Sequence, residues 1–127
     1  MAIQIKAVER GQPGVAGGGA KKFYASPVHG REMTLDGLTK GIEKTSTVNG
    51  ADIRAVLYAL VEEAVTGLSE GRIIRLGDLG SLRITISSEA RDTPEQVNAA
   101  AVKKAGVIFT PGKKLQDMLK AAKYTKA

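Results

Sequence analysis

The residues of this sequence that, by type and position, most clearly suggest a chemical role are cations. They lie on a predicted β-hairpin and at the start of a basic terminal helix. Arg72, Arg75 and Arg83 punctuate the segment 71–84, in a chain whose formal net charge is +6. Further along, the segment 109–115 (Phe-Thr-Pro-Gly-Lys-Lys-Leu) turns from strand into a basic helix. Guanidinium and ammonium groups neutralise phosphates, so this pattern indicates a surface that holds phosphates.

Positive charge is concentrated in particular segments of the chain. Residues 1–33 carry five basic and two acidic side chains, and residues 108–127 carry five and one. Residues 71–86 carry three basic side chains and one acidic, whereas residues 34–70 carry three basic and six acidic. We therefore expect a basic surface facing nucleic acid to be built from the hairpin and the two chain ends, with the middle of the chain forming core and subunit contacts.

Catalytic and metal-binding chemistry finds little support in the composition. The chain has no cysteine and one histidine, His29, which lies in a Pro-Val-His-Gly turn without a partner of metal-ligand spacing. The segment 17–22 lacks the spacing and the Ser/Thr of a phosphate-binding P-loop. No apolar run reaches the roughly 18 residues of a membrane span, and the N-terminus has no signal-peptide core. The sequence predicts no enzyme, metal, cofactor, small-molecule substrate or membrane association.

The first part of the chain is predicted to form a strand pair. Residues 2–8 alternate between apolar and polar side chains, and residues 21–28 can form a second strand. The glycine-rich segment 11–19 between them interrupts regular structure. We therefore expect two parts, an N-terminal strand extension over residues 1–32 and a DNA-binding domain over residues 33–127.

Two helices are predicted next. Thr34 is a suitable N-cap for a short helix, and either Asn49 or Asp52 can cap a second, longer one. Apolar residues recur at helical spacing from Ile53 to Leu68, and Gly71 suits the position after the helix end. This apolar stripe is wide for a small domain. It packs either on the hairpin sheet or against a second copy of the chain, and the sequence leaves both open.

The second half is predicted to hold a hairpin, an irregular segment and a terminal helix. The hairpin turn covers residues 77–80, and residues 87–105 contain few strand formers. Pro94 suits the first position of a short helical turn, and the strand is expected to resume at residues 107–109. The helix after Pro111 should direct Leu115, Met118 and Leu119 inward.

The order of these elements and two motifs resemble the bacterial histone-like HU and integration host factor family. The family's Gly-Phe-Gly-x-Phe hairpin stands here as Asp-Leu-Gly-Ser-Leu at residues 78–82, and its Phe-x-x-Gly-Lys-x-Leu pattern stands at residues 109–115. The similarity covers roughly residues 33–121, and it is greatest to Bacteroides-type variants with an N-terminal extension. It implies an α+β, HU-like fold with two helices, an antiparallel sheet bearing an extended arm and a terminal helix, preceded here by the extra strand pair.

The resemblance also implies a function. Family members are intertwined homodimers that are associated with the cytoplasmic nucleoid and take part in DNA condensation. Their β-arms embrace double-stranded DNA through the minor groove with little sequence specificity, and a proline at each arm tip bends it. Lys113 matches the family's phosphate-contacting lysine, while Gly80 and Ser81 match the turn near the DNA backbone. The candidate DNA-binding residues are Arg72, Arg75, Arg83, Arg91, Pro94, Lys103, Lys104, Lys113 and Lys114.

The predicted arm departs from the family pattern in its charge. The family carries several arginines around an Arg-Asn-Pro tip, whereas here Arg91 alone precedes Pro94, and Asp92 and Glu95 lie beside that proline. An acidic tip weakens attraction to phosphates. A second hypothesis is therefore an HU-fold scaffold or protein-interaction module with weak or no DNA binding, whose N-terminal strands cover the surface or pair with another chain.

Overall fold

The computed structural model describes residues 2–127 and is a mixture of α and β structure. In this part of the chain, three α-helices and two three-stranded sheets are present, which confirms the α+β class. Contacts divide the chain into two units. One holds the residues through Glu32 together with Met118–Ala127, and the other holds Met33–Asp117. Each unit is described by itself.

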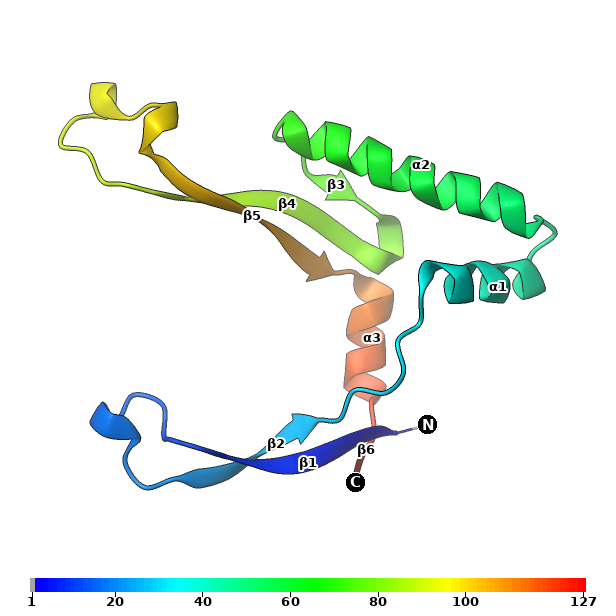
Figure 1. Ribbon diagram of the computed structural model, residues 1–127, viewed down its shortest axis with the longest axis horizontal. Helices are drawn as coiled ribbons and strands as arrows, with labels where there is room; N and C mark the ends of the chain where they lie inside the picture. The colour runs from blue at the N-terminus through cyan, green and yellow to red at the C-terminus, as the bar shows by residue number, and fades with distance from the viewer. Residues whose placement is uncertain (1) are drawn as a thin grey trace. The chain divides into compact units, whose positions relative to one another are not determined.

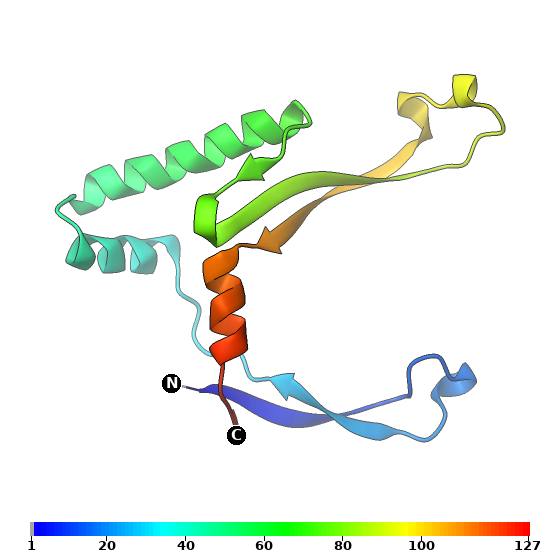
Figure 2. The same ribbon diagram turned by 180° about the vertical axis from the view of Figure 1, so that it is seen from behind.

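The first unit contains a sheet of order β2-β1-β6 (Figure 2). β1 (Ile3–Arg10) pairs antiparallel with β2 (Lys22–Pro27), and β6 (Tyr124–Lys126) lies parallel to β1. In the glycine-rich connection, the Gln12 backbone N–H donates to the Gly18 carbonyl at 2.6 Å, and its side-chain amide donates to the Ala20 carbonyl at 2.9 Å. The sequence did not predict β6, which pairs with a strand more than a hundred residues away.

The helices of the second unit begin and end where local chemistry predicts. α1 (Leu35–Thr45) is capped by Thr34, whose hydroxyl accepts from the Gly37 N–H at 3.2 Å. Of the two candidates for the cap of α2 (Gly50–Ser69), Asn49 takes the role and accepts from the Asp52 N–H at 3.0 Å. Beyond α2, Gly71 adopts a φ of 78°, and the next N–H returns to a helix carbonyl, as in a glycine-terminated helix.

The second sheet has the order β3-β4-β5 and is antiparallel. β3 (Ile74–Arg75) turns into β4 (Gly80–Ser88) through the short helical turn Gly77–Leu79, and β4 pairs with β5 (Val102–Pro111). β4 and β5 extend together into an arm (Figure 1). Its end carries the 3-10 turns Pro94–Gln96 and Ala99–Ala101, so Pro94 begins a helical turn as predicted.

The strand boundaries of this arm differ from the prediction. The irregular segment expected over residues 87–105 is shorter, because β4 continues to Ser88 and β5 already begins at Val102. Ladder hydrogen bonds and cross-strand neighbours compensate for weak strand formers such as Lys104 and Gly106. The register shifts between Ser87 and Ser88, where Lys103 is the extra residue of β5.

The chain buries little apolar surface. Among the described residues, Ile53 and Ala101 are the only buried hydrophobic ones. In α3 (Lys113–Ala121), Met118 and Leu119 are 53% and 52% exposed, so the prediction that they face inward is wrong for the single chain. No helix in the described part of the chain is both long and apolar enough to cross a membrane.

Candidate nucleic-acid interface

The two faces of the β3-β4-β5 sheet differ in chemistry. Strand alternation and register place Ile74, Leu82, Ile84, Val107 and Phe109 on one face. This apolar face is turned toward α2, because a side chain added at Gly67 of that helix would collide with Ile74. The stripe of α2 and Leu82 also border a hollow of about 300 Å³.

The opposite face carries cations and hydroxyl groups, with the apolar Ile108 opposite Arg83. Arg75 pairs with Ser81 across β3 and β4, Arg83 follows two residues along β4, and Lys104 of β5 lies opposite Ser87. No residue that the described register places on this face is acidic. We call this surface the cationic face; its donors are Arg75, Ser81, Arg83, Thr85, Ser87, Lys104 and Thr110.

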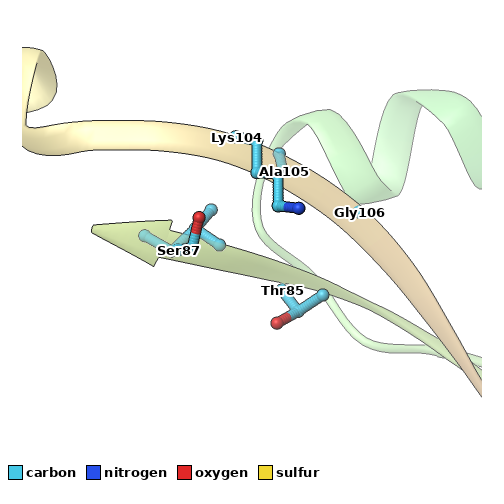
Figure 3. A pocket seen from close by; sticks show the side chains of 6 residues that line it. Thr85, Ser87, Lys104, Ala105 and Gly106 are labelled. Atoms are coloured by element: carbon cyan, nitrogen blue, oxygen red, sulfur yellow. The ribbon is translucent and has the colours of Figure 1, made fainter. Parts of the chain in front are cut away.

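Two hollows open along the cationic face. The first has a volume of about 330 Å³ and is lined by Thr85, Ser87, Lys104 and Gly106, together with Ile86 and Ala105 of the opposite face (Figure 3). The second has a volume of about 230 Å³ and is lined by Arg75, Ser81 and Thr110, among other residues. Hydroxyl, guanidinium and ammonium groups all donate hydrogen bonds to phosphate oxygens. The face can therefore hold anionic oxygens along its length.

Two glycines hold the turn beside this face in place. Gly80 adopts a φ of 147°, and a Cβ there would collide with the Thr110 carbonyl and the Phe109 ring. A Cβ at Gly112 would collide with the backbone of Asp78, and the Gly112 N–H donates to the Leu79 carbonyl at 2.9 Å. The two motifs identified in the sequence therefore meet through their glycines, where the backbones approach too closely for a side chain.

Three of the predicted site residues engage acidic neighbours. Arg72 lies 3.5 Å from Glu70, Arg91 lies 2.8 Å from Glu89, and Lys113 lies 3.1 Å from Asp117. These exposed pairs are weak in energy, but each places a negative charge beside the cation. The predicted site is therefore less uniformly positive at these positions than on the cationic face.

The remaining predicted residues are spread over other elements. Lys103 is the extra residue of β5, Pro94 lies at the end of the arm, and Lys114 is exposed in the first turn of α3. Of the nine candidates, the register brings Arg75, Arg83 and Lys104 onto one face. Alternation along β3 places Arg75 on the face opposite Ile74.

Sequence reasoning noted Ser81 only as part of the turn near the DNA backbone, and it missed the other hydroxyl groups of the cationic face. Ser81, Thr85 and Ser87 are separated from Arg83 by even numbers of residues, which puts them on the same side of a strand. This even spacing could have assigned the three residues to the face of Arg83 from the sequence alone. Thr110 could not be found this way, because its place depends on how β5 pairs with β4.

Comparison with known proteins identifies the family. The family model described as "HU domain fused to wHTH, Ig, or Glycine-rich motif" matches residues 1–126. The chain belongs to this HU-domain family, which confirms the resemblance found in the sequence. No curated protein matches the chain.

A solved structure with the same fold provides a comparison. It is a crystal structure from Bacteroides vulgatus ATCC 8482, described as a "Putative bacterial DNA binding protein", with 15% sequence identity and a TM-score of 0.70. The alignment covers 98% of this chain and 48% of that one, so this chain spans about half the length of its structural neighbour. At this identity the likeness concerns the fold.

Proposed function

We propose that this protein binds duplex DNA through the sugar-phosphate backbone, with little dependence on base sequence. The cationic face is the observation that carries the proposal. It presents Arg75, Arg83 and Lys104 among four hydroxyl side chains, without an acidic group. Donors of this kind contact phosphates, which look alike whatever the base sequence. Membership of the HU-domain family supports the same function.

The proposed active form is a homodimer with the HU arrangement. Along α2, Val61 and Val65 are 57% and 59% exposed, and the hollow of about 300 Å³ beside them is apolar. Exposed apolar surface of this extent is typical of an interface with another chain. A second copy of the chain would cover the stripe and supply the core that one chain lacks.

The sequence-derived division into an N-terminal extension (1–32) and an HU-like part (33–127) belongs to this proposal, as do association with the cytoplasmic nucleoid and DNA condensation.

DNA bending is the part of the proposal that requires most of the arm tip. Pro94 lies exposed at the end of the arm, where a wedge would enter the minor groove, but Asp92 and Glu95 flank it and Arg91 pairs with Glu89. We therefore expect binding to be governed by the cationic face and bending to be modest.

The proposal is tested by titrating the full chain into fluorescent random-sequence duplexes between about 50 and 200 mM salt. We expect the logarithm of the binding constant to fall linearly with the logarithm of salt concentration, with a slope of about −3 or steeper. Duplexes of unrelated sequence should bind within about threefold of one another. Absence of binding at about 50 mM salt, where phosphate contacts are strong, would favour the scaffold hypothesis instead.

A further inference from the structure

The β2-β1-β6 sheet also has two unlike faces. Ile3, Ile5, Phe23, Pro27 and Tyr124 lie on one side, together with Glu9, the single acidic residue of these strands. The register places Lys6, Arg10 and Lys22 on the other side. This second side, which we call the basic hairpin face, has no acidic residue in any of its three strands.

The cations of the basic hairpin face lie near one another without compensation. Arg10 lies directly opposite Lys22, and Lys21 precedes that pair at the neck of the glycine-rich connection. Like charges placed opposite each other destabilise a strand pair. Of the ion pairs between described residues, none includes any of these cations or Lys6.

An ordinary solvated sheet face does not explain this arrangement well. Solvated surfaces mix the two signs of charge, which relieves repulsion between neighbours. Here residues 3–27 carry four basic side chains and one acidic, whereas residues 86–104 of the β4–β5 arm carry three of each. The hairpin therefore carries a net charge of +3, whereas residues 86–104 of the arm carry none, so the hairpin offers an attraction for a polyanion that this part of the arm lacks.

The connection at the end of this hairpin allows a close approach. Gly14 and Gly17 have φ values of 78° and 72°, and a Cβ at either position would meet no atom within 4 Å. Gln12 donates hydrogen bonds to the carbonyls of Gly18 and Ala20, and these bonds close the connection into a loop. A backbone without side chains can lie directly against the surface of a ligand.

We propose that the basic hairpin face, with Lys6, Arg10 and Lys22 and with Lys21 at its neck, is a second binding site for the phosphate backbone of duplex DNA. A strand rises about 3.3 Å per residue, so Lys6 and Arg10 lie about 13 Å apart. Duplex DNA carries one charge per roughly 1.7 Å of its axis, so the face spans several phosphates. This inference rests on the proposed function and adds a site outside the β4–β5 arm.

The test compares two triple variants of the full chain on the same random-sequence duplex. Lys6→Gln/Arg10→Gln/Lys22→Gln removes the proposed contacts. Lys40→Gln/Lys44→Gln/Lys126→Gln removes the same charge from α1 and from the opposite face of the hairpin sheet. We expect the first variant to reduce the magnitude of the salt slope by about 2 to 3 and to weaken binding about 10- to 100-fold at about 100 mM salt. The second should keep the wild-type slope.

The outcomes separate this inference from the proposed function. An unchanged slope in the folded first variant, with wild-type binding intact, overturns the second site and leaves the function standing. Failure of the wild type to bind overturns both. An unchanged duplex slope with lost binding to anionic phospholipid vesicles also overturns the inference, because it assigns the face to a membrane surface. Circular dichroism checks the fold. If the triple variant unfolds, Lys22→Gln should lower the slope by about 0.9 and Lys126→Gln should not.

Discussion

At the scale of single residues, what surrounds a cation matters more than its presence in a motif. Arg75 and Arg83 lie on a face without acidic groups, whereas Arg72 and Arg91 each have a glutamate within ion-pair distance. The sequence predicts all four arginines as DNA-binding residues and does not distinguish between them. A phosphate must compete with the glutamate for the paired arginines and has no such competitor on the cationic face.

This difference predicts unequal effects of two matched double variants. Arg75→Gln/Arg83→Gln should lower the salt slope of duplex binding by about 1.8, since two phosphate contacts are lost. Arg72→Gln/Arg91→Gln removes the same charge and should change the slope by less than about 0.5. Fluorescence anisotropy at four salt concentrations measures both slopes. Equal losses would show that the cationic face has no special role.

Among the glycines, Gly80 is the one at which an added Cβ would meet a neighbouring atom at the shortest distance. Gly80→Ala should lower the free energy of unfolding by about 1 to 3 kcal/mol, because a φ of 147° and the Thr110 carbonyl leave no room for a Cβ. The control is Gly41→Ala in α1, where the added Cβ meets no atom within 4 Å. In that helix interior alanine should stabilise by about 0.5 to 1 kcal/mol. Urea unfolding gives both values, and a neutral Gly80→Ala would contradict the close approach.

At the scale of elements, helices and strands are specified in different ways. The caps of α1 and α2 and the glycine that follows α2 are local, because the interacting groups lie within a few residues of one another. β5 is specified by its partner: its first residues are poor strand formers that pair with the end of β4. An error in the predicted strand start was therefore to be expected, and errors at the helix ends were not.

The cap of α2 allows the local specification of a helix end to be tested. Asn49→Ala should lower the free energy of unfolding by about 1 kcal/mol, because the Asp52 N–H loses its acceptor. Asn49→Ser keeps a side-chain oxygen at the cap and should lose only a small part of that stability. Thermal unfolding followed by circular dichroism compares the two. A larger loss for serine than for alanine would show that the residue acts through contacts other than the cap.

At the scale of the whole molecule, the buried core of one chain is small. Ile53 and Ala101 are the only buried hydrophobic residues among those described, while many apolar side chains of α2, α3 and the β4–β5 arm, such as Val65, Met118 and Ile86, are more than half exposed. At about 25 cal/mol per Å² of apolar surface, covering such residues is a large source of stability. Dimerisation is the simplest way to supply it.

A single substitution on the apolar stripe of α2 tests whether the chain dimerises through it. The wild type should have twice the 13.3 kDa mass of one chain in multi-angle light scattering. Val61→Glu places a charge on the stripe and should abolish the dimer or weaken it by at least about 100-fold, because an unpaired buried charge is costly. Val15→Glu introduces the same charge at a similarly exposed valine of the glycine-rich connection and should leave the mass unchanged. A wild-type mass of one chain would contradict the proposed dimer.

The sequence by itself determined the features whose causes are local: the α+β class, the two capped helices, the hairpin turn, and the motif glycines Gly80 and Gly112. Side-chain alternation also determined that Arg75 and Ile74 lie on opposite faces. Tertiary structure decided which strands pair and in what register. It thereby placed Lys104 beside Ser87, Arg10 opposite Lys22, and β6 along β1. The physical reason is that alternation assigns residues to faces within one strand, whereas only hydrogen bonding between distant strands decides which faces combine into a surface.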